Sequence, residues 1–313
     1  MTMLRRCRQG AAAWLASLCL AVAACGSSNP LGVATGNMNS IIVGSADFPE
    51  SKIVAEIYAQ ALQTNGFNIG RRLGIGSRET YIPALKDHSI DLMPEYIGNL
   101  LLYFQPDATV TKLDAVELEL YKRLSGDLSI LTPSPASDTD TVTVTGETAA
   151  KWNLKTIADL AKHSPDVKFA APSAFQTRPQ GLVGLRQRYG LDVSPGNFVA
   201  ISDDGGAVTV RALVDATVTA ANIFSTSPAI SQNHLAVLDD PEHNFLAGNI
   251  VPLVNSQKKS DRLKDVLDAV SAKLTTLGLA DLNAAVTGNS GVDPDDAARK
   301  WLRNKDFDHP IGS

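Results

Sequence analysis

The sequence predicts an α/β protein with two lobes, and three observations indicate this fold class. Short apolar runs alternate with helical periodicity along most of the chain. Two segments rich in turn-forming residues, 131–140 and 238–249, interrupt this alternation. The chain has 313 residues, of which 44% are hydrophobic and 19% charged, so it can bury two cores.

We expect residues 41–135 and 245–313 to form the first lobe. Its first elements are expected at Ile41–Gly44 (strand), at 53–62 (helix), at 68–74 (strand), at Tyr81–Asp87 (helix) and at Ile90–Met93 (strand). The segment DLMPEYIGN follows, so Glu95 and Tyr96 stand at the end of a strand. Ligands are usually held at the carboxyl ends of strands in such sheets.

Residues 136–244 are expected to form the second lobe. Strands are predicted at 141–147, 168–171, 197–201 and 219–224, and helices at 156–162, 180–189 and 207–215. The chain then returns through IVPLV and ends in helices, with one apolar stripe from Leu263 to Leu277 and another helix from Asp293 to about Leu302. Two lobes joined by two crossovers leave a cleft, as in binding proteins that close about a hinge.

The pattern of residues at the N-terminus indicates an export signal. Three arginines precede the run AAAWLASLCLAVAA, which is too short for an ordinary membrane-spanning helix. Residues 1–24 are therefore predicted to be a signal peptide, with cleavage before Cys25 as in lipoproteins. The alternative is a plain secretory signal in which this cysteine occurs by chance.

Lipid on Cys25 would anchor the exported protein to the outer face of the cell membrane, and residues 25–40 would form a flexible tether. The other two cysteines lie in the leader, so the mature chain cannot form an internal disulfide. Loss of the leader arginines changes the net charge from −5 to about −8. Such a chain has no electrostatic footprint for nucleic acid.

No motif in the sequence requires catalysis, a cofactor or a metal. The five histidines are dispersed without metal-ligand spacing, and no GxSxG elbow occurs. The glycine turns GIGS and DDGG complete neither a dinucleotide fingerprint nor a P-loop. We therefore expect that the protein is not an enzyme. The alternative is a catalytic triad whose residues are distant in the sequence and meet only in the folded chain.

Several segments together resemble the osmoprotectant-binding proteins of ABC importers. They are GSADFPESKIVAEI, LGIGSRETYIPALKDHSIDLMPEYIGNLL, LTPSPASDTDTVTV, FQTRPQGL, ANIFSTS, ADLNAAV and DPDDAARKWL. The resemblance covers residues 41–302, and its most specific parts are the PEY-x-G and RP-x-G segments. It implies a two-lobed periplasmic-binding-protein fold of type II that traps glycine betaine, choline, carnitine or proline.

The resemblance also implies a site. A methylated cationic head cannot donate a hydrogen bond, so aromatic faces and nearby oxygens must hold it. Tyr96 is similar to a ligand-binding tyrosine of the family, and Glu95 would add negative potential beside it. Arg178 resembles the arginine that pairs with a ligand carboxylate. The alternatives are packing for the tyrosine and solvent exposure for the two charged residues.

The remaining site residues expected from the resemblance are Ser77, Asp140, Phe224, Ser225 and Thr226. Asp140 stands where relatives have an aromatic residue, so the cage looks poorer in aromatics, although Asp140 would attract a cation directly. Phe224 replaces a tyrosine of many relatives and keeps the aromatic face without the hydroxyl. Three further aromatics near these segments, Phe48, Tyr81 and Phe175, are expected in the core.

The resemblance implies a monomeric receptor, without chemistry of its own, that delivers a small solute to the permease and ATPase subunits of an ABC importer. Two alternatives stay open. The same fold could bind a larger or less cationic solute or act as a sensor, or the chain could be a cell-surface hydrolase with a spatial triad.

Overall fold

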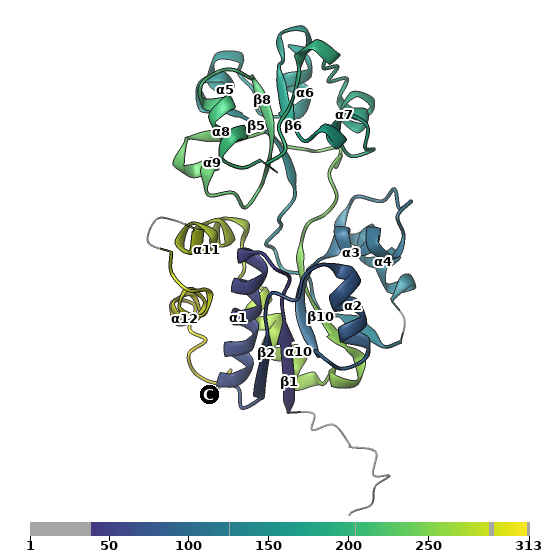
Figure 1. The fold of residues 1–313 in the computed structure, drawn as a ribbon, viewed down its shortest axis with the longest axis vertical. Helices are drawn as coiled ribbons and strands as arrows, with labels where there is room; N and C mark the ends of the chain where they lie inside the picture. Colours follow the sequence, from purple (N-terminus) through teal and green to yellow (C-terminus); the bar gives the residue numbers. More distant parts are fainter. Residues whose placement is uncertain (1–38, 125, 204, 288–290, 312–313) are drawn as a thin grey trace, which may run out of the picture. The chain divides into compact units, whose positions relative to one another are not determined.

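The structure is a computed structural model that describes residues 39–124, 126–203, 205–287 and 291–311 (Figure 1). The predicted signal peptide and nearly all of the predicted tether, with Cys25, lie outside these residues. In the part of the chain that is described, no helix combines the length and apolar character needed to cross a membrane.

The first sheet has the strand order β2-β1-β3-β10-β4. Its strands are β1 (Ser40–Gly44), β2 (Asn68–Arg72), β3 (Leu92–Tyr96), β4 (Leu128–Ile130) and β10 (Ile250–Asn255). β1 pairs in parallel with β2 and β3, whereas β10 is antiparallel to β3 and β4. The strand that the sequence predicts before Glu95 and Tyr96 is therefore central in this sheet and ends at Tyr96.

Helices cover both faces of the first sheet (Figure 1). They are α1 (Pro49–Thr64), α2 (Arg78–Lys86), α3 (Ile97–Phe104), α4 (Leu113–Arg123), α10 (Asp261–Ser271), α11 (Thr276–Thr287) and α12 (Pro294–Asn304). Neighbouring residues of β3 enter different cores, because successive side chains of a strand point to opposite faces. Leu92 packs with α1, α10 and α12, and Met93 packs with α2, α3 and α4.

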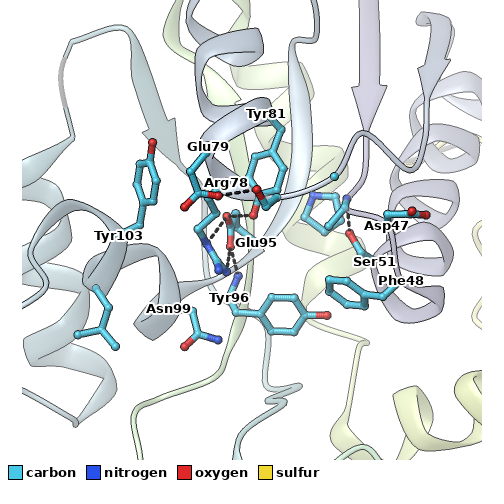
Figure 2. Close-up of a pocket in the computed structure, with 15 residues that line it drawn as sticks. Asp47, Phe48, Ser51, Arg78, Glu79, Tyr81, Glu95, Tyr96, Asn99 and Tyr103 are labelled. Atoms are coloured by element: carbon cyan, nitrogen blue, oxygen red, sulfur yellow. Dashed lines mark hydrogen bonds and ion pairs between the residues drawn. The ribbon is translucent and has the colours of Figure 1, made fainter. Parts of the chain in front are cut away.

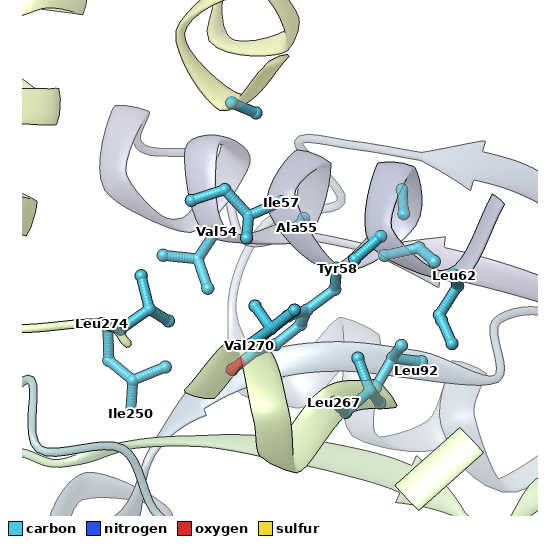
Figure 3. Close-up of a cluster of buried hydrophobic side chains, with 14 of the residues drawn as sticks. Val54, Ala55, Ile57, Tyr58, Leu62, Leu92, Ile250, Leu267, Val270 and Leu274 are labelled. Atoms are coloured by element: carbon cyan, nitrogen blue, oxygen red, sulfur yellow. The ribbon is translucent and has the colours of Figure 1, made fainter. Parts of the chain in front are cut away.

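The core between α1 and α10 shows why these helices form. Tyr58 of α1 extends toward Val270 of α10, and Leu92 of β3 lies beside Leu267, in a cluster that also holds Ile57 (Figure 3). All five side chains have no exposed surface. Each such side chain stabilises the fold by about 1.5–3 kcal/mol relative to an exposed one.

The second sheet repeats the same mixed arrangement, with the order β7-β6-β8-β5-β9. Its strands are β5 (Asp140–Thr145), β6 (Phe169–Ala171), β7 (Phe198–Ala200), β8 (Ala220–Phe224) and β9 (Leu235–Val237). Its helices are α5 (Gly146–Trp152), α6 (Ile157–Ala161), α7 (Leu182–Tyr189), α8 (Ala207–Val214) and α9 (Ala229–Gln232). Two apolar clusters flank it, so this sheet also has its own core.

Two chain segments run between the sheets, one from β4 to β5 and one from β9 to β10, and they pair with each other (Figure 1). Asp138 N–H donates to the Gly248 carbonyl at 3.0 Å, and Ile250 N–H donates to the Ala136 carbonyl at 3.1 Å. A Cβ atom on Gly248 would lie 1.9 Å from the Asp138 carbonyl oxygen. Only glycine permits this close pairing of the two crossovers.

Two details of the sequence prediction were wrong. The stripe from Leu263 to Leu277 does not continue through one helix, because α10 ends at Ser271 and Leu277 in α11 is 78% exposed. Phe48 is not a core residue, since it is 41% exposed. Tyr81 and Phe175 are buried, as predicted.

Candidate functional site

The carboxylate that ends β3 is buried in a closed network. Arg78 donates to Glu95 through Nε at 3.0 Å and Nη2 at 2.8 Å, and the Tyr81 hydroxyl donates to Glu95 Oε1 at 2.6 Å (Figure 2). Tyr96 N–H donates to Glu95 Oε2 at 2.8 Å. Because Arg78 compensates its charge, Glu95 fixes the end of the strand and adds little free negative potential.

Two members of this network, Tyr81 and Arg78, have raised pKa values. Burial and the charge of Glu95 raise the pKa of the Tyr81 hydroxyl, so the tyrosine stays a donor. Burial alone would lower the pKa of Arg78, but the Glu95 carboxylate beside it raises that pKa overall. Tyr81 therefore stays a neutral donor and Arg78 stays charged, and both hold Glu95 in place as a fixed wall of the site.

Tyr96 points the other way, toward the first turn of α1 (Figure 2). Its hydroxyl donates to Glu50 Oε1 at 2.6 Å, and its ring centroid lies 6.0 Å from that of Phe48. Asn283 of α11 donates through Nδ2 to Glu50 Oε2 at 2.6 Å. Burial, then the charge of Glu50, raises the pKa of Tyr96 well above its usual value, so the hydroxyl remains protonated.

A second acidic residue, Asp138, accompanies Glu50. It lies in the first crossover and accepts a hydrogen bond at 2.8 Å from the Thr226 hydroxyl. Burial, followed by repulsion from Glu50, raises the pKa of the Asp138 carboxyl to about 7. Neither Glu50 nor Asp138 forms an ion pair with a lysine, arginine or histidine of the described chain.

These two carboxyl groups line one cavity of about 520 Å³. The other side chains that matter for its chemistry are Phe48, Phe224, Thr226 and Asn283. Phe48 and Phe224 are 41% and 37% exposed, which is unusual for phenylalanine. No lysine, arginine or histidine of the described residues lines this cavity. It therefore combines open aromatic faces with uncompensated negative charge, which suits a cation.

A neighbouring cavity of about 640 Å³ lies beside the end of β3 (Figure 2). Phe48 lines both cavities, and Ser77, Arg78, Glu95 and Tyr96 line this one. Its charged side chains already have partners in the described chain: Arg78 pairs with Glu95, Asp47 pairs with Lys52, and Glu79 accepts from Ser77. The smaller cavity is therefore the better candidate for binding a charged solute.

The arginine of the RP-x-G segment is engaged elsewhere. Arg178 Nη2 donates to Asp140 Oδ2 at 2.8 Å, and its guanidinium carbon lies 4.9 Å from the centre of the Phe175 ring. Gly181 permits this loop, because a Cβ atom there would lie 1.9 Å from the Phe175 carbonyl oxygen. Arg178 lines neither cavity, and its charge is matched by Asp140.

The remaining residues expected from the sequence separate into two groups. Phe224 and Thr226 line the smaller cavity, whereas Ser77 lines the larger one and donates to Glu79. Ser225 accepts from Thr139 N–H at 3.0 Å and donates to the Ser137 carbonyl at 2.9 Å. Ser225 therefore fastens the first crossover to the end of β8.

Sequence reasoning missed Glu50, Asp138 and Asn283. Asp138 stands two residues before the predicted Asp140, in the same SDTD stretch, so the position of this stretch in the family motif is the signal that could have indicated it. Glu50 reads as an ordinary acidic residue in the first turn of a helix. Asn283 lies 233 residues from Glu50, and nothing local in the sequence indicates that contact.

The two mixed sheets and their paired crossovers define a two-lobed periplasmic-binding-protein fold, which confirms the predicted fold class. Residues 39–304 match the family described as the substrate binding domain of ABC-type glycine betaine transport systems. The chain belongs to this family. The resemblance found in the sequence is thereby confirmed.

Three relatives illustrate the similarity. The chain is 26% identical over 274 residues to the glycine betaine-binding protein YehZ of Escherichia coli K12, covering 84% of this chain and 90% of YehZ. The apo structure of YehZ superimposes with a TM-score of 0.74 and 25% identity, over 86% of this chain and 99% of the other. A solved glycine betaine/carnitine/choline ABC transporter structure has a TM-score of 0.77 at 21% identity, over 86% and 99% of the chains, and shares the fold.

The third relative is the ergothioneine transport permease/ergothioneine binding protein EgtU of Helicobacter pylori G27. It is 25% identical over 252 residues, which is 79% of this chain but only 44% of EgtU. These three relatives are named for transport or solute binding, and none is named as an enzyme.

Proposed function

We propose that this chain is an extracytoplasmic solute-binding lipoprotein of an ABC importer. It binds an osmoprotectant such as glycine betaine, choline, carnitine or proline in the cavity of about 520 Å³ and delivers it to the permease. Family membership supports the transport class. The single observation that carries the ligand class is the pairing of two exposed phenylalanines with two carboxyl groups that have no cationic partner in the described chain.

The chemistry of the cavity fits a methylated ammonium group. Such a group carries charge but has no N–H to donate, so it gains from aromatic faces and from nearby anionic oxygens. Phe48 and Phe224 offer the faces, and Glu50 and Asp138 offer the oxygens. Each cation–π contact contributes about 0.5–2 kcal/mol, more when water is excluded.

Delivery requires the partner subunits of an importer. One relative, EgtU, carries both a permease and a binding protein in its name, and this chain aligns with less than half of it. That supports a role in which the chain works with a separate permease and its ATPase. Uptake of labelled choline by cells with and without the gene separates delivery from a sensing role.

The leader sequence, rather than the cavity, supports a lipid anchor. Cleavage before Cys25 and addition of lipid would hold the mature chain at the outer face of the membrane. Cys25→Ser should move the protein from the membrane fraction to the soluble exported fraction. Retention of the variant in the membrane fraction would reject the lipid anchor without touching the binding proposal.

The binding proposal is tested with the purified mature chain. Isothermal titration with choline, glycine betaine, carnitine, proline and ergothioneine should give saturable heat for at least one compound and none for glucose. Heat is the better readout because neither Trp152 nor Trp301 lines the cavity. The absence of binding by every compound carrying a quaternary ammonium group would reject the proposed ligand class.

Ergothioneine belongs in this panel because a relative is named for it. Binding of ergothioneine alone would favour the second candidate, in which the same fold takes a larger solute.

A further inference from the structure

We propose that the cavity selects a quaternary ammonium cation that lacks a carboxylate and discriminates against zwitterions. This inference rests on the proposed function, which it narrows from osmoprotectants in general to choline-like cations. Three observations carry it: the charge of the cavity, the hydrogen-bonding atoms that it offers, and the pairing of Arg178.

Every charged side chain of the described chain that lines the cavity is acidic. Glu50 is 5% exposed and, like Asp138, has no cationic partner there. A third carboxylate, Asp203, accepts hydrogen bonds from Val208 and Thr209 at the start of α8. A bound cation would offset the cost of burying these like charges, whereas the carboxylate of a zwitterion would add to their repulsion.

Three side-chain donors at or beside the cavity are already used by its carboxylates. The hydroxyls of Tyr96 and Thr226 donate to Glu50 and Asp138, and Asn283 Nδ2 donates to Glu50. Asn283 Oδ1 is buried and accepts no hydrogen bond from the described residues. A ligand hydroxyl can donate to this oxygen, but a ligand carboxylate cannot. Ser227 adds one neutral hydroxyl, which can donate or accept.

The guanidinium that could receive a carboxylate already pairs with Asp140 through one nitrogen, Nη2. Arg178 is bonded to Asp140, stacks on Phe175 and lines neither cavity. Its Nε is buried and unbonded to the described residues, so an incoming carboxylate would have to displace Asp140 to use the full fork. Asp140, which the sequence suggested as a direct partner for a cation, acts here as the partner that neutralises Arg178.

The first test compares three probes on the unaltered mature protein by isothermal titration. Choline should bind at least tenfold more tightly than glycine betaine. It should also bind at least tenfold more tightly than 3,3-dimethylbutan-1-ol, which has the same shape without charge. Equal or tighter binding of glycine betaine would overturn this inference while leaving the proposed function intact, and failure of all quaternary compounds to bind would overturn both.

The second test uses variants. Asp138→Asn should weaken the binding of choline at least fivefold. The matched control is Asp215→Asn, at an exposed residue paired with Arg211, and it should leave the affinity for choline unchanged. A specific loss of glycine betaine binding in Arg178→Gln, with choline unaffected and the protein folded by circular dichroism, would show that Arg178 already binds the carboxylate and would overturn the inference.

Discussion

Glu95 and Tyr96 are adjacent in the sequence but belong to different parts of the molecule. Successive side chains of a strand point to opposite faces, so one enters the Arg78 network and the other reaches Glu50. The carboxylate fixes the end of β3, and the ring of Tyr96 is thereby held against Phe48. Glu95, which fixes the end of β3, is thus distinct from Glu50 and Asp138, whose carboxyl groups would attract the solute.

The structural role of Glu95 can be measured by urea unfolding. Glu95→Gln removes the charge that compensates Arg78 and should lower the free energy of unfolding by about 3 kcal/mol, because one member of a buried pair is left without its partner. Glu79→Gln, at an exposed carboxylate of α2, is the control and should keep the wild-type midpoint. Equal midpoints for the two variants would contradict the role given to Glu95.

Asp138 should make binding depend on pH. Its raised pKa of about 7 reflects burial and the nearby Glu50 and Asp140 carboxylates, opposed by hydrogen bonds from Thr226. A bound cation favours the ionised carboxylate, so affinity should be full above that pKa and fall as Asp138 becomes protonated. The dissociation constant for choline should rise about tenfold between pH 8 and pH 6.

The Asp138→Asn variant is the control for this titration, because it cannot change charge over this range. Its weaker affinity should be the same at both values of pH. A flat profile in the wild-type protein would show that Asp138 does not titrate against the ligand.

Among the elements, the sequence located strands and helices well where apolar spacing was regular. The predicted strand 219–224 is observed as Ala220–Phe224, and the predicted helix 207–215 as Ala207–Val214. The prediction failed after Ser271, where no glycine or proline marks the end of α10. Packing of the turn against the core, rather than local residue preference, ends that helix.

Two leucines in this region provide a matched test. Leu274 is fully buried in the turn after α10, and Leu277 is 78% exposed in α11. Leu274→Ala should cost about 2–5 kcal/mol of unfolding free energy, because it leaves a cavity in the core. Leu277→Ala should change stability by less than about 0.5 kcal/mol. Similar losses of unfolding free energy for both variants in denaturant unfolding would support the single helix, with one apolar stripe from Leu263 to Leu277, that the sequence predicted.

The crossovers also depend on one residue. Gly248→Ala would place a Cβ atom 1.9 Å from the Asp138 carbonyl oxygen, so the paired segments must separate. We expect a loss of about 1–3 kcal/mol in unfolding free energy and weaker choline binding, since Asp138 moves.

The matched control for this change is Gly196→Ala. A Cβ atom at Gly196 meets nothing within 4 Å, so its thermal midpoint and choline affinity should stay at wild-type values. Wild-type affinity and stability in Gly248→Ala would show that the close pairing is dispensable.

At the scale of the whole molecule, the candidate site could be predicted only in part. Sequence segments indicated Tyr96, Phe224 and Thr226, because family motifs carry them. They could not indicate that Tyr96 meets Glu50, 46 residues away, or that Asn283 meets both Glu50 and the Thr226 carbonyl. The first contact forms within the first sheet and its helices, where β3 ends beside the start of α1, and the contacts of Asn283 exist because the chain crosses between its sheets twice and returns with α11.

The cavity therefore draws on distant parts of the chain. Phe48 and Glu50 come from the start of α1, Asp138 from a crossover, Phe224 from the end of β8 and Asn283 from α11. A cationic head should be held among these residues, and locating the bound ligand tests this position directly.

The most direct measurement is a crystal structure with arsenocholine, in which arsenic replaces the nitrogen of the head group. Diffraction at the arsenic absorption edge should give one strong anomalous peak inside the cavity, beside the Phe48 and Phe224 rings and the carboxyl groups of Glu50 and Asp138. A peak beside Arg178, in the cavity next to Ser77, or elsewhere on the chain would contradict the account.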